Sequence, residues 1–402
     1  MTTLRAGRLT VSLLLAVGSV GMSAELALAD DWPQPFHDAG HTNRNEDAGF
    51  TAADLQELRE VRTIEMPGEI TGFVVADGAA FVTWAVRSSG LVIGGGVARI
   101  GLDGVPVWSR DTSCQLSEPA VVSGSLLYRR SQTFTCPGPP FPPIVAVDAA
   151  TGKDQRWHAP LWWYLPAVDR VFAATAIVDD HDGDMQTSLR SVDPVTGERS
   201  WNIPIDPPNP THTYPVADGG SLFVRRYFHG IQALDAETGE EAWSWDLVSG
   251  SPRPLAVAHG RLFTELRYVG DGTVRLRATE TSTGDELWTR RLDPNYESSP
   301  NEVRPLSVSP RAVVVPQARS VLAFDPESGA RLWRRDISSP GITGAGRFVF
   351  VSGTRPNGSR TMIVLAASTG RPIARLDPVT GYVIVAADRL LWAEDDEIYV
   401  WR

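Results

Sequence analysis

The sequence has very little lysine. Lys153 is the only lysine, so arginine supplies the other 36 of the 37 basic residues in this chain of 402 residues. Mechanisms that depend on a lysine, such as Schiff-base formation or a phosphate-binding P-loop, therefore have one candidate side chain. That side chain follows a Thr-Gly pair, and we interpret the segment as a turn.

An excess of positive charge and a long apolar run are also missing. The 48 acidic residues outnumber the basic ones and give a net charge of −11. This balance disfavours non-specific binding to nucleic acid. No stretch approaches about 20 uninterrupted apolar residues, so we expect no membrane span. Hydrophobic residues make up 42% of the chain, which is enough for a large core.

Residues 1–29 have the pattern of a secretory signal peptide. Two arginines precede a short apolar run over residues 9–20, and Ala27-Leu28-Ala29 provides a cleavage site of small residues. We expect a mature protein that begins at Asp30 and is secreted or periplasmic, soluble after cleavage. An uncleaved N-terminal membrane anchor is the alternative.

The chain has only two cysteines, and we predict that they form a disulfide. Cys114 and Cys136 flank a predicted hairpin over residues 119–128, whose turn lies near Ser123-Gly124. Both cysteines therefore fall near the open end of one hairpin, where a cross-strand disulfide can form. Export to an oxidising compartment favours this pairing over two free buried thiols.

Tryptophan is abundant, and its positions are periodic. Six of the 13 tryptophans, at positions 108, 157, 201, 243, 288 and 333, follow one another at spacings of 49, 44, 42, 45 and 45 residues. A nearly constant period in the forties indicates a repeat architecture.

A turn motif precedes each of these tryptophans. Most copies place an Asp or Glu four residues before a glycine, with Thr or Ser directly before that glycine; the five complete copies are residues 148–152, 193–197, 235–239, 280–284 and 325–329. Residues 102–104 form a shortened copy, and residues 368–370 form a degraded copy without the acid or the tryptophan. The glycine suits a positive φ, and the Asp and Thr side chains can bind turn N–H groups, so we predict tight hairpins.

Two hairpins in each period predict a four-stranded blade, and blades arranged in a ring form a β-propeller. The third strands begin near residues 97, 144, 189, 231, 274, 321, 363 and 398, which predicts eight blades. The C-terminal blade has only three strands, and the segment 58–65 is a strand without a hairpin partner. We therefore expect this N-terminal strand to complete the last blade and close the ring.

The fold class predicted is thus all-β, an eight-bladed propeller, with seven blades as the fallback if the degraded copy is not a full blade. The predicted domains are a signal peptide over residues 1–29, an N-terminal extension over residues 30–57 and a single propeller over residues 58–402.

The repeats also resemble a known family. The string Ile231-Gln-Ala-Leu-Asp-Ala-Glu-Thr-Gly-Glu-Glu-Ala-Trp243 is similar to the pyrroloquinoline-quinone (PQQ)-type propeller repeat, and residues 31–43 are similar to the segment that precedes the ring in such proteins. This repeat occurs in quinoprotein dehydrogenases and in the propeller lipoprotein of outer-membrane assembly, so the resemblance implies a fold rather than an activity. It also implies that the repeat tryptophans and glycines pack the blades together.

The resemblance implies a quinone-dependent alcohol or sugar dehydrogenase as one alternative. Such enzymes hold the quinone with a disulfide between adjacent cysteines, with Ca²⁺ on carboxylate and amide ligands, and with an Asp base. The two cysteines here are 22 residues apart, and the sequence offers no match for the calcium ligands or the base. We therefore expect no bound cofactor and assign no catalytic residue, while PQQ and Ca²⁺ remain the alternative.

Other catalytic and metal sites have weaker support. Asp180, Asp182 and Asp184 partly resemble a calcium loop, but the Glu expected further along is missing, so we favour a solvated hairpin loop. The chain lacks a Gly-x-Ser-x-Gly nucleophile motif.

The most promising binding surface is one face of the ring. The loops that leave the second and fourth strands should share a face, and on this face we place aromatic and arginine side chains: Trp162, Trp163, Tyr164, Arg129, Arg130, Arg225, Arg226 and Tyr227. Arginines beside aromatic rings can hold an anionic or planar ligand or a peptide. Side chains that merely cap the blade edges are the alternative.

We therefore expect an exported, monomeric propeller that binds a protein, peptide or small ligand on one face and has no catalysis of its own. A quinone-dependent oxidoreductase is the first alternative, and a ligand-sensing or cell-envelope assembly module is the second.

Overall fold

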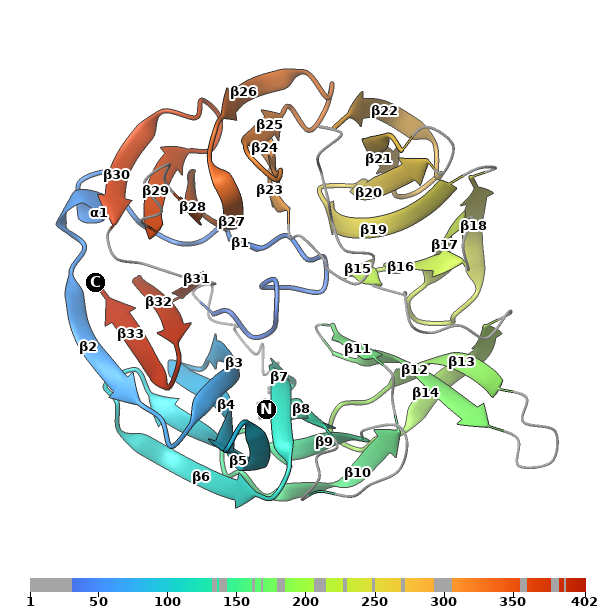
Figure 1. The fold of residues 1–402 in the computed structure, drawn as a ribbon. Coiled ribbons are helices and arrows are strands. Elements are labelled where there is room, and N and C mark those ends of the chain that lie inside the picture. The colour runs from blue at the N-terminus through green and yellow to red at the C-terminus, as the bar shows by residue number, and fades with distance from the viewer. Residues whose placement is uncertain are drawn as a thin grey trace, which may run out of the picture.

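The chain folds into a ring of eight antiparallel blades around a central axis (Figure 1). The computed structural model describes residues 31–131, 136, 143–160, 163–167, 169–178, 185–205, 215–226, 230–247, 250–268, 272–292, 306–354, 360–376, 383–386 and 388–402. The prediction of eight four-stranded blades is confirmed, and the degraded copy at residues 368–370 belongs to a complete blade.

The first four blades follow one another along the chain, and each begins with the strand nearest the axis. Blade 1 consists of β3 (Glu69–Ala76), β4 (Ala79–Ser88), β5 (Leu91–Gly101) and β6 (Pro106–Thr112); blade 2 of β7 (Gln115–Val122), β8 (Ser125–Ser131), β9 (Pro143–Asp148) and β10 (Asp154–Pro160); blade 3 of β11 (Trp163–Pro166), β12 (Val171–Val178), β13 (Met185–Val192) and β14 (Arg199–Ile205); blade 4 of β15 (Val216–Asp218), β16 (Ser221–Arg226), β17 (Gly230–Asp235) and β18 (Glu241–Asp246).

The next three blades repeat this order. Blade 5 consists of β19 (Gly250–Ala258), β20 (Arg261–Tyr268), β21 (Val274–Glu280) and β22 (Glu286–Arg291); blade 6 of β23 (Ser307–Ser309), β24 (Ala312–Pro316), β25 (Val321–Phe324) and β26 (Arg331–Arg335); blade 7 of β27 (Ser338–Ala345), β28 (Phe348–Thr354), β29 (Arg360–Ala366) and β30 (Pro372–Leu376). The short strand β1 (Arg44–Asn45) adds to blade 7 in parallel with β27.

Blade 8 is built from both ends of the chain. Its inner strands are β31 (Val383–Ala386), β32 (Arg389–Glu394) and β33 (Glu397–Trp401), and its outer strand is β2 (Glu60–Glu65). β2 pairs antiparallel with β33, with Thr63 opposite Tyr399. The predicted closure by the N-terminal strand is thus confirmed. The pairing covers one edge of β2 and one edge of β33, which would otherwise have unpaired backbone groups. The single helix among the described residues, α1 (Asp54–Glu57), leads into β2.

Tryptophan and glycine lock neighbouring blades together. A Cβ placed on Gly152 would lie 2.8 Å from the ring of Trp108 in the preceding blade, so only glycine lets the indole lie flat on the turn. The indole Nε1 of Trp108 also donates a hydrogen bond of 3.0 Å to the carbonyl of Ala149. The same contact joins four further tryptophan–glycine pairs: Trp201 with Gly239, Trp243 with Gly284, Trp288 with Gly329 and Trp333 with Gly370.

The turns themselves have the predicted chemistry. In the turn that begins at Asp148, Oδ1 accepts hydrogen bonds from the N–H and the hydroxyl of Thr151, at 2.7 and 2.6 Å. These bonds hold the pKa of Asp148 below its usual value, although burial opposes them slightly. Gly152 completes the turn with φ +69°, which glycine adopts without strain.

The two faces of the ring differ. Because strands alternate in direction, the turns between the first and second strands and between the third and fourth strands share one face, which we call the turn face. The longer connections between the second and third strands and from blade to blade share the other face, which we call the loop face. Most segments that the structure does not describe connect strands on the loop face.

The N-terminal residues 31–47, which we call the axial segment, cross the centre of the ring on the turn face (Figure 1). Its carbonyl groups accept backbone hydrogen bonds of 2.7–3.0 Å from the first strands of blades 1, 2, 4, 5, 6 and 7, at Val75, Val121, Ala217, Val257, Val308 and Gly344. The side-chain amide of Asn45 donates to the carbonyl of Val385 in blade 8, and Ala39 packs against an apolar cluster that blades 3 and 4 share. The axial segment therefore forms hydrogen bonds with seven of the eight blades and packs against a cluster to which blade 3 contributes.

Candidate binding site

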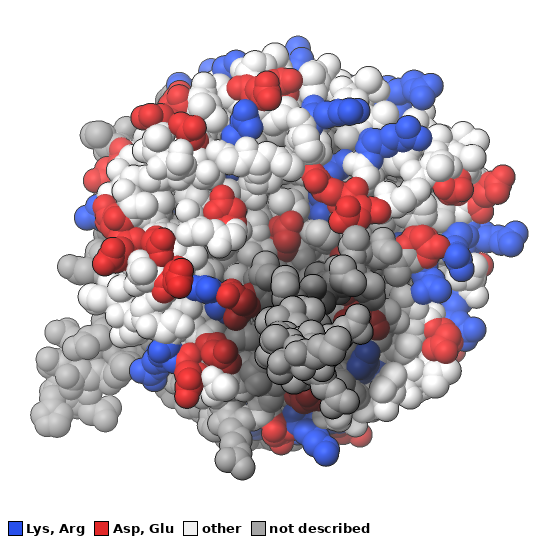
Figure 2. Space-filling view, turned by 180° about the vertical axis from the view of Figure 1, so that it is seen from behind, with Lys and Arg blue, Asp and Glu red and all other residues white. Residues whose placement is uncertain are grey.

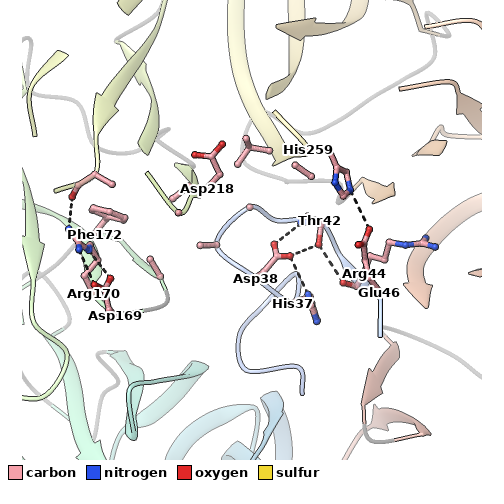
Figure 3. A pocket seen from close by; sticks show the side chains of 18 of the residues that line it. His37, Asp38, Thr42, Arg44, Glu46, Asp169, Arg170, Phe172, Asp218 and His259 are labelled. Atoms are coloured by element: carbon pink, nitrogen blue, oxygen red, sulfur yellow. Dashed lines mark hydrogen bonds and ion pairs between the residues drawn. The ribbon is translucent and has the colours of Figure 1, made fainter. Parts of the chain in front are cut away.

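A cavity of about 450 Å³ opens beside the axial segment on the turn face (Figure 3). The axial segment forms one wall. The others come from the region of the first turns of blades 3, 4 and 5, together with Ala236 from the turn between the third and fourth strands of blade 4. We call this cavity the axial pocket. Its size falls in the range of small-molecule sites, about 300–1,000 Å³.

The wall from the axial segment carries a chain of polar contacts. Asp38 Oδ2 lies 3.2 Å from His37 Nδ1 and accepts a 2.5 Å hydrogen bond from the Thr42 hydroxyl. Burial favours the neutral acid, but the contacts with His37 and Thr42 prevail and lower the pKa of Asp38. Asp38 is therefore a carboxylate at neutral pH.

The backbone of this wall is unusual. Phe36, His37, His41 and Asn43 all have positive φ, between 48° and 79°. Such conformations cost free energy in residues other than glycine and persist where the surroundings hold them. The hydrogen bonds to the blades hold this segment in place, which pre-organises the wall.

The second wall comes from blades 3 and 4. Arg170 binds Asp169 with two bonds of 2.8 and 2.9 Å and donates a third, of 2.9 Å, to the carbonyl of Ala236. Its guanidinium group is therefore engaged within the protein. Asp218 is the last residue of β15, directly before the turn, and accepts a 3.2 Å hydrogen bond from the N–H of Ser221. Burial raises the pKa of Asp218, although backbone hydrogen bonds partly offset it.

The third wall joins blade 5 to the axial segment. His259 Nε2 lies 3.3 Å from Glu46 Oε1. Arg44 also borders the axial pocket, but only 2% of this residue is exposed, and its NH1 donates to Ser307 Oγ and to the carbonyl of Phe348. Burial lowers the pKa of Arg44 to about 10, with Glu46 opposing, so Arg44 stays charged at neutral pH.

The floor of the axial pocket is apolar and made of small residues. Ala39, Ala167, Ala217, Ala236 and Ala258 line it, together with Phe172 and Val257. The arrangement combines charged walls with a floor on which an alkyl chain can lie, as ligand sites commonly do.

The residues described do not fit the calcium ligand set that the PQQ resemblance implies. Across the described ranges, no three His, Cys, Asp or Glu side chains gather closely enough to hold a metal ion. The disulfide joins Cys114 to Cys136 rather than two adjacent cysteines. We therefore derive no step through a quinone in this protein.

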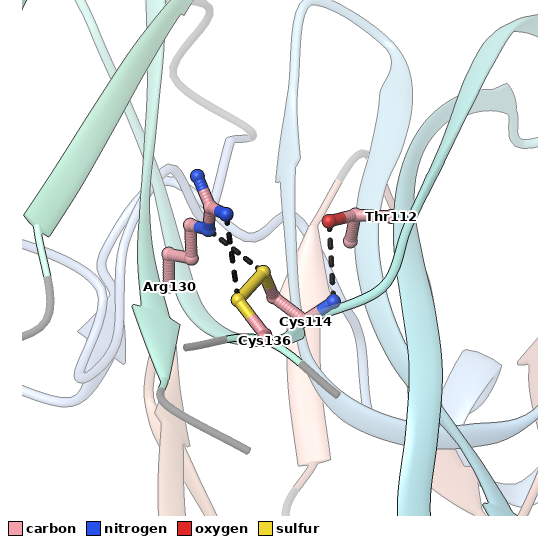
Figure 4. The surroundings of a disulfide bond; sticks show 4 residues. All are labelled: Thr112, Cys114, Arg130 and Cys136. Atoms are coloured by element: carbon pink, nitrogen blue, oxygen red, sulfur yellow. Dashed lines mark hydrogen bonds between the residues drawn. A yellow bond between two sulfur atoms is a disulfide. The ribbon is translucent and has the colours of Figure 1, made fainter. Parts of the chain in front are cut away.

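The predicted disulfide is present (Figure 4). Cys114 lies directly before β7 and Cys136 lies beyond β8, at the open end of their hairpin, with a Cα–Cα distance of 5.0 Å. Both cysteines are buried, and Arg130 lies over the bond, with Nε 2.7 Å from Cys114 Sγ and NH2 3.4 Å from Cys136 Sγ. Arg130, predicted as a ligand contact, thus contacts the disulfide.

The other residues of the predicted binding face lie at the loop-face ends of blades 2, 3 and 4. Arg129 is half-buried, Tyr164 in β11 is half-buried, Arg226 is exposed, and Arg225 is buried and donates a 2.6 Å hydrogen bond to Ser251 Oγ. Burial, and then repulsion from Arg253, lowers the pKa of Arg225. Trp162 and Tyr227 lie outside the described residues, as do Asp180, Asp182 and Asp184, and the side chain of Trp163 is not described.

Sequence reasoning missed the axial pocket. Asp218 is the last residue before the first turn of blade 4, and His259 lies in the first turn of blade 5; we interpreted both segments only as hairpins. Their signal was His259 where blades 2 and 7 have Ser123 and Gly346, and Asp218 where those blades have Val122 and Ala345. His37, Asp38 and Thr42 could not be assigned to the same site, because the axial segment has no repeat partner in the sequence.

The charged surface agrees with the composition. On the side of the molecule opposite to that of Figure 1, acidic side chains are spread over the described surface and interspersed with basic ones (Figure 2). On this face, the residues drawn in colour form no continuous basic surface for a nucleic-acid backbone. None of the described helical segments is long and apolar enough to cross a bilayer.

The fold and repeat define an eight-bladed propeller of the PQQ-like class. The chain belongs to the family whose model is described as outer membrane protein assembly factor BamB, which matches residues 185–320 and 317–401, together 217 of the 402 residues.

Curated relatives include two alcohol dehydrogenases of Pseudomonas putida. The chain is 25% identical over 294 residues to quinohemoprotein alcohol dehydrogenase ADH IIB, with 64% of this chain and 41% of that protein covered. It is 28% identical over 174 residues to quinohemoprotein alcohol dehydrogenase ADH-IIG, with 37% and 22% covered. The chain thus spans less than half the length of these relatives.

Solved structures share the fold at low identity. BamB from Moraxella catarrhalis matches with a TM-score of 0.56 and 18% identity over 86% of this chain and 99% of that one. Quinohemoprotein alcohol dehydrogenase from Comamonas testosteroni matches with a TM-score of 0.62 and 15% identity over 94% and 81%.

Proposed function

We propose that this protein is an exported PQQ-like propeller that acts as a binding or scaffold protein, without catalysis of its own. The observation that carries the proposal is the axial pocket, whose charged walls come from three blades and the axial segment. Hydrogen bonds to the blades fix the axial segment in position. A preformed cavity on a rigid ring suits recognition. The loop face, with Arg129, Arg226 and Tyr164 at its strand ends, remains a proposed surface for a protein or peptide partner.

Two further observations support this function. The disulfide between Cys114 and Cys136 fits an oxidising compartment outside the cytosol. The family model takes its description from an assembly factor, which supports a cell-envelope assembly module as the more specific form of the same proposal.

A quinone-dependent oxidoreductase is the second candidate function. The observation that favours it is the 25% identity to a quinohemoprotein alcohol dehydrogenase over 294 residues. The described residues supply no cluster of metal ligands, so the likeness rests on the repeat that scaffolds and enzymes share.

An absorption spectrum of the natively purified protein, with and without added PQQ and Ca²⁺, separates the two. We expect no quinone absorbance and no dye reduction with alcohols or sugars. A bound quinone chromophore together with dye reduction would contradict the binding proposal. Protein heated above its melting temperature and then given PQQ and Ca²⁺ serves as the control for non-specific quinone binding.

A further inference from the structure

We propose that the axial pocket binds an organic cation, through an ammonium or guanidinium group that contacts Asp218 and Asp38. This inference rests on the proposed binding function and names the ligand class for one site. The cation can belong to a free amine or to a lysine or arginine side chain of a partner.

The first argument is charge. The lining includes five carboxylates, on Asp38, Glu46, Asp47, Asp169 and Asp218, but only two guanidinium groups, on Arg44 and Arg170. Carboxylates that line one concave, partly desolvated space reinforce each other's field and attract cations into it.

The second argument is that both arginines are already engaged. Arg170 is held in two bonds by Asp169 and in a third by the carbonyl of Ala236. Arg44 is 98% buried and directs NH1 toward Ser307 and Phe348, away from the open space. Neither arginine is available to neutralise the remaining carboxylates, so an anion is the wrong ligand for this cavity.

The third argument is Asp218 itself. Within the described residues, its carboxylate receives hydrogen bonds from backbone N–H groups only and forms no ion pair. The other carboxylates with named partners, on Asp38, Glu46 and Asp169, each face a His or an Arg. A half-buried carboxylate without a counterion is costly, and a ligand cation removes that cost.

The cavity provides a position for the cation between its walls. Asp38 on the axial segment and Asp218 on blade 4 lie on different walls of the same cavity (Figure 3). The alanines that also line this cavity suit the methylene groups of an alkylammonium or alkylguanidinium ion. At Gly219, next to Asp218, an added Cβ would meet no atom within 4 Å, so the turn is not crowded.

The experiment is calorimetric titration of the full chain with three probes. These are ethylguanidinium, the peptide acetyl-Gly-Arg-Gly-amide and the same peptide with citrulline, which keeps the shape but lacks the charge. The proteins are the wild type, Asp218→Asn and Asp77→Asn. Asp77 lies in the equivalent turn of blade 1, outside the axial pocket, so Asp77→Asn makes the same chemical change on the same face.

For each guanidinium probe, we expect Asp77→Asn to have the same affinity as the wild type. We expect Asp218→Asn to bind each probe about tenfold more weakly than the wild type, because it loses a charge-assisted hydrogen bond. Tighter binding of the arginine peptide than of ethylguanidinium identifies a partner chain as the source of the cation, and equal affinity identifies a free amine. If Asp218→Asn does not fold, as judged by circular dichroism, Asp38→Asn takes its place.

The proposal is overturned if the wild type binds neither guanidinium probe, if the citrulline peptide binds as tightly as the arginine peptide, or if Asp77→Asn weakens binding as much as Asp218→Asn. Such a failure leaves the proposed binding function standing, because that function is tested separately by the quinone spectrum.

Discussion

Two kinds of joint between neighbouring blades can be compared among the described residues. In five described joints a tryptophan lies on a glycine of the next blade, and its indole donates a hydrogen bond of 2.7–3.1 Å to the backbone carbonyl three residues before that glycine. In the joint between blades 8 and 1, Arg62 of β2 takes this place above Gly104. The repeat therefore changes where the chain must close the ring.

The closing joint relies on strand pairing and on apolar packing instead. β2 pairs with β33 across the two ends of the chain. Ile64 of β2 packs in a buried cluster with Trp32, Trp84 and Ile398, which come from the axial segment and from blades 1 and 8. The comparison shows that a joint without the indole contact can be held by pairing between two strands that are far apart in the sequence.

Removal of an indole should have the largest effect. Trp288 is buried, donates to the carbonyl of Pro326 at 3.0 Å and packs against Phe263 and Phe324. We expect Trp288→Ala to lower the free energy of unfolding by about 3–5 kcal/mol. Arg62→Ala, the matched change in the closing joint, should cost less than about 1 kcal/mol, because Arg62 is exposed. Urea denaturation measures both, and equal losses would contradict the two-joint description.

Acid should weaken the attachment of the axial segment, which forms hydrogen bonds with seven of the eight blades whatever kind of joint they have. Burial lowers the pKa of His41 to about 4 from 6.5, although Asp38 opposes this. The unfolded state then binds a proton at a higher pH than the folded state does. The contribution of neutral His41 to the free energy of unfolding is fully present above pH 6.5. It decreases as the pH drops to about 4, by at most about 3 kcal/mol.

The control for this pH effect is His41→Asn, which tolerates the positive φ of 52° at this position. The raised pKa of Asp218 acts in the opposite direction, since its protonation stabilises the folded state, and it is present in both proteins. The stability of the wild type relative to His41→Asn should therefore decrease between pH 6.5 and 4. A constant difference across that range would show that His41 does not titrate in this way.

The smallest expected effect is a difference between two glycine substitutions. Gly329 and Gly104 both have positive φ, +66° and +81°, so an alanine at either costs about 1–2 kcal/mol. The Cβ at position 329 would also lie 2.6 Å from the rigid ring of Trp288, whereas at position 104 it would lie 3.2 Å from the flexible Arg62 side chain. We expect Gly329→Ala to be the more damaging by about 1–3 kcal/mol. Thermal melting of the two variants tests this, and equal losses would mean that the indole moves aside.

Local patterns predicted most of the fold. The acid-to-glycine turns at residues 148–152 and 325–329 could be read directly, since each turn depends on residues four positions apart. The closure by residues 58–65 was also predictable, because the strand count left one strand without a partner. The disulfide followed from the position of Cys114 and Cys136 around one hairpin.

The axial pocket could not be predicted in this way. Its polar groups come from residues 37–46, 169–170, 218 and 259, which lie far apart in the chain. Each looked ordinary in its own segment: Asp218 and His259 as turn residues, and Asp38 as part of an extension before the ring.

The sequence by itself determined the period, the turns and the number of blades, because hydrogen bonds and packing between near neighbours specify them. Only the tertiary structure decided that residues 31–47 lie across the ring axis and that Asp218 faces the same cavity as Asp38. Ring closure brings these residues together, and no local rule encodes a contact between segments about 180 residues apart.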